Sequence, residues 1–220
     1  MSIRVFRLIL CACLLCFSHI SSAVIVSADW QVGGDNLITR DTSASLEWLD
    51  LTVTLNRSYN DISSKFGVGQ EFEGWRYATS IEIASFFDAF GGDSDYYEIG
   101  WSTQNNGLLD AMSPYWGDTY CETNGCAPGE GYVDMVFGEL YDSGVHWRAV
   151  INDIHTISTT TTQDFVDIHS QVLADVGSFT NTGNALVRNI SPVPVPAAVW
   201  LFGSGLIGLI GLAKSKKIIN

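Results

Sequence analysis

The chain has 220 residues and a net charge of −13 at pH 7, and this length allows one domain with targeting segments at its ends. Residues 24–190 hold all 24 acidic residues, six basic ones and six of the seven tryptophans, so this part is expected to fold and carries a net charge of −18. The negative charge excludes nucleic acid and anionic membrane surfaces as expected partners of the domain.

The N-terminus has the parts of a cleavable secretory signal peptide. Arg4 and Arg7 precede an apolar run at residues 8–17, and small residues follow at Ser21-Ser22-Ala23. We therefore predict a signal peptide over residues 1–23, removed by signal peptidase. The apolar run is about half the ~20 residues that a membrane-spanning helix needs. A lipoprotein site at Leu10-Cys11-Ala12-Cys13 is a less favoured alternative, because the apolar run before it is too short.

Two segments early in the domain have helix start and stop signals. Ser58 with Asp61 predicts a capped helix that places Tyr59, Ile62 and Phe66 on one face and ends at Gly67. Thr79 with Glu82 has the form of a capping box. The second helix carries an apolar stripe before a glycine pair, at Ile83, Phe86, Phe87, Phe90 and Gly91-Gly92. Both stripes are interpreted as core packing against a sheet.

An acidic segment follows the second predicted helix. Asp93 and Asp95 are two residues apart and Glu98 follows, a spacing at which carboxylates on flexible loops bind calcium. The full EF-hand loop is missing, so we favour a solvated acidic turn. A calcium site at Asp93, Asp95 and Glu98 is the alternative, and we expect no other cofactor.

Residues 107–131 are predicted to form a long loop region. Aromatic residues flank it or lie in it, and exposed ones would stack on sugar rings: Trp101, Tyr115, Trp116 and Tyr120. Trp116 is the first candidate for a ligand contact. Cys121 and Cys126 remain after signal removal, and the turn former Asn124-Gly125 between them predicts one disulfide. A zinc site is disfavoured because two thiols supply too few ligands.

The rest of the domain is predicted to be strand and loop. β-branched and large apolar residues are frequent at residues 46–55, 132–137, 145–157 and 185–190. Two early helices followed by a half rich in strands and loops predict an α+β fold, in one compact domain over residues 24–190.

Little in the chain predicts catalysis. The domain lacks a Gly-x-Ser-x-Gly nucleophile elbow, and no Cys–His pair remains once the disulfide forms. His146, His155 and His169 lack His-x-x-x-His spacing. We therefore expect no enzymatic activity. The alternative is an extracytoplasmic hydrolase of polysaccharide, which would need two paired carboxylates.

The C-terminal segment is predicted to hold the chain in a membrane. Three prolines make residues 191–196 an extended spacer. Residues 197–213 carry no charge and reach about 25 Å as a helix, enough for a thin bilayer. The basic tail over residues 214–220 holds Lys214, Lys216 and Lys217, which keep that end in the cytoplasm and the domain outside.

This tail resembles the PEP-CTERM sorting signal in its VPLPA-like form. The resemblance covers Val193 to Lys217 and begins with Val193-Pro194-Val195-Pro196-Ala197, followed by Ala198-Val199-Trp200-Leu201-Phe202-Gly203-Ser204-Gly205. It implies recognition at Val193, Pro194, Val195, Pro196 and Ala197 by an exosortase, a membrane-embedded processing enzyme of Gram-negative bacteria. It also implies association with exopolysaccharide or biofilm matrix. Val195 and the lysines depart from the leucine and arginines that are common in the family.

The order of motifs in the domain is similar to the bacterial Lcl/DUF1566 group. The matching segments are Leu46-Glu47-Trp48-Leu49-Asp50, Tyr59-Asn60-Asp61, Gly74-Trp75-Arg76-Tyr77-Ala78-Thr79 and Ala185-Leu186-Val187-Arg188. The resemblance implies a C-type lectin-like fold, in which the first and last strands pair and a long loop region carries binding. Tyr77-Ala78 stands where the group has Leu-Pro. We also expect a guanidinium stacked on an indole, with a structural role for Trp75 and Arg76.

Together these features predict an exported, exosortase-sorted protein of the cell surface or extracellular matrix. Its precursor would be anchored in inner-membrane lipid by the C-terminal helix. The non-catalytic domain would bind exopolysaccharide or a protein partner, or would be purely structural.

Overall fold

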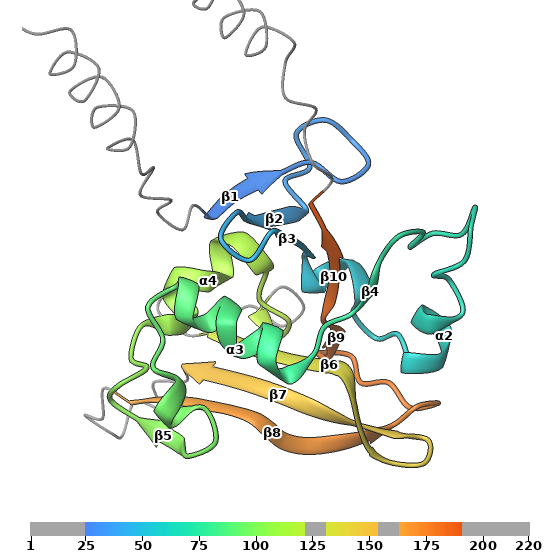
Figure 1. Cartoon of the computed structure of the whole chain (residues 1–220). Coiled ribbons are helices and arrows are strands. Elements are labelled where there is room, and N and C mark those ends of the chain that lie inside the picture. The colour runs from blue at the N-terminus through green and yellow to red at the C-terminus, as the bar shows by residue number, and fades with distance from the viewer. Residues whose placement is uncertain (1–24, 122–130, 154–162, 191–220) are drawn as a thin grey trace, which may run out of the picture. The chain divides into compact units, whose positions relative to one another are not determined.

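Two five-stranded sheets organise the computed structural model, which describes residues 25–121, 131–153 and 163–190 (Figure 1). Sheet A has only antiparallel pairs, and its order is β1 (Ile25–Ala28), β2 (Ile38–Asp41), β3 (Leu46–Leu49), β10 (Leu186–Asn189), β4 (Arg76–Tyr77). Sheet B has the order β5 (Gly100–Ser102), β8 (Asp164–Ala174), β7 (Val145–Asp153), β6 (Gly131–Asp142), β9 (Gly183–Asn184). Strand β9 is parallel to β6, and the other pairs are antiparallel.

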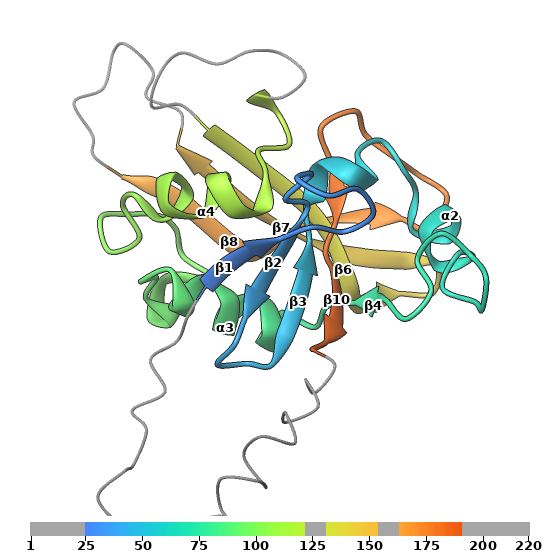
Figure 2. The ribbon, with the colours of Figure 1, turned by 90° about the horizontal axis from the view of Figure 1, so that it is seen from above.

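The longer helices lie between strands β1–β3 and sheet B. Figures 1 and 2 show α3 (Ser80–Ala89) and α4 (Leu108–Trp116) over sheet B, with α2 (Tyr59–Ser63) at the side of the domain. Two short 3-10 turns, η1 (Leu51–Thr54) and η2 (Ser94–Tyr96), complete the described elements. The core between these layers is aromatic: the Trp48 ring centroid lies 4.3 Å from Phe86 and 5.2 Å from Trp116. The predicted α+β class is therefore confirmed.

Both early helices form with the predicted caps. The Ser58 hydroxyl accepts the Asp61 N–H at 3.2 Å, and Thr79 and Glu82 make the reciprocal bonds of a capping box. Arg76 holds the Glu82 carboxylate through two bonds of 2.6 and 2.8 Å. Helix α2 ends at Ser63, one turn before the predicted glycine, because the chain then enters the turns that lead to β4.

Two predicted boundaries are wrong. The strand expected over residues 46–55 stops at Leu49, because the Asp50 side chain accepts the Thr52 N–H and starts η1. The predicted loop over residues 107–131 contains α4, in spite of Pro114 inside this helix. This helix forms because its apolar face is buried in the core through Leu108, Leu109, Met112 and Trp116.

Glu47 joins three neighbouring strands of sheet A. In the strand register it lies opposite Arg40 of β2 and Arg188 of β10, and each arginine Nε donates to one carboxylate oxygen at 2.6 Å. Burial alone would raise the pKa of Glu47, but the two arginines outweigh burial and lower it. Arg188 also stacks on the Trp75 ring at 4.5 Å. The expected guanidinium–indole stack is thus present, with Arg188 rather than Arg76 as its cation.

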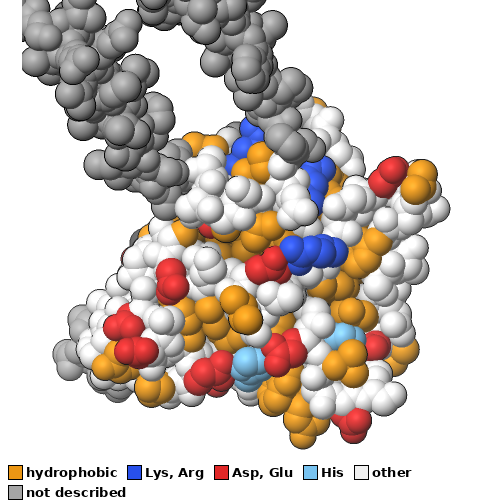
Figure 3. Space-filling view, viewed as in Figure 1, with side chains coloured by type: hydrophobic (Ala, Val, Ile, Leu, Met, Phe, Trp, Pro, Cys, Tyr) orange, Lys and Arg blue, Asp and Glu red, His pale blue; other side chains and the backbone are white. Residues whose placement is uncertain are grey.

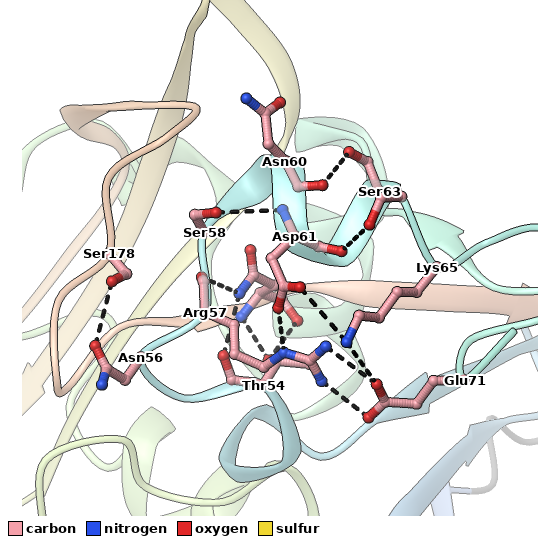
Figure 4. A network of polar contacts seen from close by, with 12 residues as sticks. Thr54, Asn56, Arg57, Ser58, Asn60, Asp61, Ser63, Lys65, Glu71 and Ser178 are labelled. Atoms are coloured by element: carbon pink, nitrogen blue, oxygen red, sulfur yellow. Dashed lines mark hydrogen bonds and ion pairs between the residues drawn. The ribbon is translucent and has the colours of Figure 1, made fainter.

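Arg57 fastens the chain before α2 to the loop after it (Figure 4). Its Nε donates to Asp61 at 2.7 Å, and its terminal nitrogens bind both oxygens of Glu71 at 2.9 and 3.1 Å. Lys65 reaches the same two carboxylates at 3.5 and 3.3 Å. The buried Asn184 of β9 donates to the Arg57 carbonyl at 3.0 Å, so the network ties α2 to the last strands of the domain.

Several predicted segments lie outside the described residues: the signal peptide 1–23, the spacer 191–196, the span 197–213 and the tail 214–220. The sorting residues, the three tail lysines and Cys126 lie there too. In the ranges that are described, no helix has both the length and the apolar content to cross a bilayer.

A buried ion pair joins β6 and β7 in sheet B. Asp134 is fully buried, and Arg148 is 6% exposed. Arg148 donates to both oxygens of Asp134, with Nε at 2.9 Å from Oδ1. Thr182 donates to the same carboxylate at 2.8 Å, and Arg148 Nη1 donates to Gln171 at 2.9 Å. The pair therefore links β6, β7, β8 and the segment before β9.

We expect Asp134→Asn to lower the free energy of unfolding by about 3–5 kcal/mol, because the Arg148 guanidinium would stay buried without a countercharge. Urea unfolding of the purified protein measures this loss. Asp142→Asn, an exposed position on the same strand, is the matched control and should change stability by less than about 0.5 kcal/mol. Equal effects of the two substitutions would contradict an anchoring role for the pair.

Candidate functional site

Four residues form a line across sheet B on the face turned away from the helices. Tyr132 of β6 is opposite Asn152 of β7, Asn152 is opposite Phe165 of β8, and Phe165 is opposite Trp101 of β5. Successive residues of a strand point to opposite faces. Because the neighbours Val133, Ile151 and Val166 are buried in the core, these four side chains point outward. We call them the outer row.

The outer row is open to solvent at its β5 end. Trp101 is 50% exposed, and its ring meets the Phe165 ring edge-on at 5.5 Å. At the other end, Tyr132 is partly buried and lies 5.9 Å from the exposed ring of Tyr120. The outer row, with Val150, Ser170 and Gln171, lines a shallow hollow of about 220 Å³.

Polar groups in the hollow are neutral. Asn152 lies between two aromatic residues of the row, and Ser170 and Gln171 line the hollow further along β8, near the position opposite Arg148. The Gln171 side-chain oxygen accepts from Arg148, and the residue is exposed. Phe179 packs on the Arg148 guanidinium at 5.2 Å. The hollow thus combines aromatic faces with amide and hydroxyl groups, a composition typical of surfaces that bind sugars.

The next residues along the same strands form a buried inner row. Ser102 is opposite Asp164, and Gly131 is opposite Asp153. These residues face α4: the Asp164 carboxylate accepts the N–H of Gly107, the N-cap of that helix, at 2.8 Å. The Ser102 hydroxyl is buried and, in the described part of the chain, makes no hydrogen bond. Burial and, after it, the charge of Asp153 raise the pKa of Asp164 to about 6, although the hydrogen bond from the Gly107 N–H opposes this rise.

Of the predicted ligand-binding aromatics, only Trp101 lies in the outer row. Trp116 was expected to be exposed in a loop, and this expectation is wrong. It ends α4, is 1% exposed and donates its Nε1–H to the Leu49 carbonyl at 3.0 Å, so it cannot stack on a ligand. Tyr115 belongs to the same helix and packs against Phe90 at 5.5 Å, away from Trp101.

Two of the three predicted calcium ligands have other contacts for their carboxylates. Asp93 accepts the Asp95 N–H at 3.1 Å and caps η2. Glu98 pairs with His169 at 2.6 Å. Over the residues that the structure describes, no three His, Cys, Asp or Glu side chains converge as metal ligands would.

The predicted disulfide is described at one end only. The Cys121 N–H donates to Asp118 at 2.7 Å, just after α4. Because Cys126 lies outside the described residues, the pairing of the two cysteines stays a prediction.

Sequence reasoning missed Tyr132, Asn152 and Phe165. Each lies next to a residue of the buried inner row. The signal that the sequence offered was therefore the alternation of inward-facing and outward-facing residues near the ends of three strands. Which residues face each other, however, depends on strand pairing, which the sequence does not state.

Asp164 should make stability fall as pH rises. Its pKa is about 6 in the folded state against an ordinary value of 3.8, so the folded state binds more protons between these values. The free energy of unfolding should therefore decrease by up to about 3 kcal/mol from about pH 4 to pH 6 and remain lower above it.

Other carboxylates have pKa values that are lowered in the folded state, and they make the free energy of unfolding rise with pH. Comparing the wild type with Asp164→Asn therefore isolates the contribution of Asp164. Thermal unfolding across pH should show a smaller loss in the variant than in the wild type. Asp95→Asn, at an exposed position, should follow the wild type. A variant with the wild-type pH profile would show that Asp164 titrates normally.

Comparison with protein-family models, characterised proteins and solved structures gave no match for this chain. What the domain does has to be inferred from the outer row, the inner row and the charges around them.

Proposed function

We propose that the protein is an exported, exosortase-sorted component of the cell surface or extracellular matrix, and that its domain binds polysaccharide without catalysis. The observation that carries the binding proposal is the outer row. Three aromatic side chains and one amide lie in register across four strands. A shallow surface suits a polymer, which has to extend beyond any one site.

Stacking on sugar rings is the physical basis of this proposal. The less polar face of a pyranose presents C–H groups, which pack on aromatic rings and remove apolar area from water. The half-exposed Trp101 offers the largest such ring, and the amides of Asn152 and Gln171 match sugar hydroxyls. A few well-placed polar groups beside an apolar surface are the usual source of orientation in ligand sites.

A polysaccharide hydrolase is the alternative. Such an enzyme needs two carboxylates that both reach the scissile bond. Asp153 and Asp164 are neighbours on adjacent strands, but their exposed fractions are 4% and 0%, and both face α4. Their burial favours a structural role and supports the non-catalytic proposal.

A C-type lectin-like fold is part of the same proposal. Its support is the antiparallel pairing of β10, the last strand, with β3 near the start of the domain. The proposed binding surface differs from the one that the resemblance implies, because the outer row lies on strands of sheet B rather than in the long loop region. Signal peptidase, an exosortase and inner-membrane lipid are the proposed partners in export and sorting.

Trp101→Ala should weaken polysaccharide binding at least about fivefold, because an aromatic contact of this kind contributes on the order of 1 kcal/mol. Affinity electrophoresis in gels that contain the polysaccharide measures the change. Tyr141→Ala is the matched control, since Tyr141 is 58% exposed on β6 but outside the outer row. If Trp101→Ala and the wild type migrate alike in a gel that retards the wild type, the row does not bind the polymer.

The sorting proposal is tested on a reporter. Val193–Asn220 fused to a secreted protein should give a membrane-held precursor, which an exosortase-containing host then processes. A fusion with Pro194→Ala and Pro196→Ala keeps the apolar span, so it should reach the membrane but resist processing. Release of the unaltered fusion without a membrane-bound stage would count against the tail as a sorting signal.

A further inference from the structure

We infer that the outer row binds an uncharged glycan chain that lies across the strands of sheet B, and that it discriminates against anionic polysaccharides. This inference rests on the proposed function and adds the chemical class and the direction of the ligand. Two sets of observations support it: the alignment of the row across the strands, and the ion pairs that the cations of the domain form with acidic residues.

The row runs perpendicular to the strands. Its members occupy β6, β7, β8 and β5 at directly opposed positions, so Tyr132 and Trp101 are three strand spacings apart, about 14 Å. The outward positions one step further along the strands are Asp134 and Val150, which are buried, and Asp167, which is partly buried. Aromatic rings therefore continue across the strands but not along them, and a chain that stacks on both ends of the row has to cross the sheet.

In the described part of the chain, no Lys or Arg near the row is available to an anionic ligand. Arg148, the arginine of sheet B, is 6% exposed, and its three guanidinium nitrogens donate to Asp134 and Gln171. A carboxylate or sulfate on the ligand would have to compete with a buried, bidentate partner.

The other Lys and Arg side chains of the domain also have acidic partners. All six Lys and Arg side chains of residues 24–190 form ion pairs with Asp or Glu: Arg40, Arg57, Lys65, Arg76, Arg148 and Arg188. Figure 3 shows Lys and Arg side chains in the upper half of the face in view, whereas Asp and Glu side chains are spread over the face and His side chains lie in its lower half. With a net charge of −18 the domain repels polyanions over a long range, so uncharged chains are favoured.

A binding panel tests the chemical class. The purified full-length protein is tested against neutral glucans and galactans, an alginate as polyuronate, and chitosan oligomers as a cationic glycan, each at low and high salt. We expect binding to a neutral glycan that salt leaves unchanged within about twofold, because no ion pair contributes to it. Trp101→Ala should reduce this binding at least fivefold, and Tyr141→Ala should not.

The direction is tested with Tyr132→Ala and with oligosaccharides of increasing length. A chain that crosses the strands should lose affinity in both Tyr132→Ala and Trp101→Ala, and the Tyr132 effect should disappear for the shortest oligosaccharides that still bind. Circular dichroism confirms that each variant is folded.

The outcomes separate the inference from the proposed function. The inferred ligand class would be overturned if the wild type bound alginate, or bound chitosan in a salt-sensitive way, and Trp101→Ala lost that binding. The outer row would then remain a polysaccharide site. Loss in Trp101→Ala alone at every chain length would overturn the direction across the strands. Binding to a glycan that neither variant affects, or to none in the panel, would overturn the proposed function itself.

Discussion

Alternation of side chains along paired strands is the constraint on which sheet B depends. Tyr132, Asn152 and Phe165 face solvent because their neighbours Gly131, Asp153 and Asp164 face α4. A slip of one residue would expose the carboxylates and bury the aromatics. Two contacts of α4 oppose such a slip. A Cβ on Gly131 would lie 2.7 Å from Leu109, and Asp164 holds the Gly107 N–H. The packing of α4 on the inner face thereby determines what the outer face presents.

Ion pairs between acidic and basic side chains are a second, separate constraint on the fold. In a domain with 24 acids and six cations, every Lys and Arg forms an ion pair, and some of these pairs join separate strands. Glu47 with its two arginines joins β2, β3 and β10, and the Asp134–Arg148 pair joins β6 and β7. Breaking such a buried pair leaves an uncompensated charge, so these contacts make the arrangement specific. The same pairing leaves no Lys or Arg without an acidic partner in the part of the domain that the structure describes, so the proposed recognition of a ligand relies on apolar faces and neutral polar groups.

Local signals predicted local structure well. The capping box at Thr79 and Glu82 and the stripe from Ile83 to Phe87 lie within one helix, so the sequence contains all their partners. Helix α4 was missed because Gly107 and Pro114 are loop signals, whereas the burial of its apolar face against sheet B decides its structure. The same helix buried Trp116, which the sequence placed in a loop. The outer row could not be predicted either, because its members come from four segments and meet only through strand register.

The separation of the two rows bears on the choice between binding and catalysis. Asp164 has the raised pKa that a general acid needs, with Asp153 beside it. A ligand on the outer row, however, lies on the opposite face of the sheet from both carboxylates, and α4 covers that inner face. Acid catalysis at a glycosidic bond requires the proton donor within hydrogen-bonding distance of the leaving oxygen. The strands that align the aromatic row therefore also place the two acids on the opposite face of sheet B, and this separation is the reason that we propose binding rather than hydrolysis at the row.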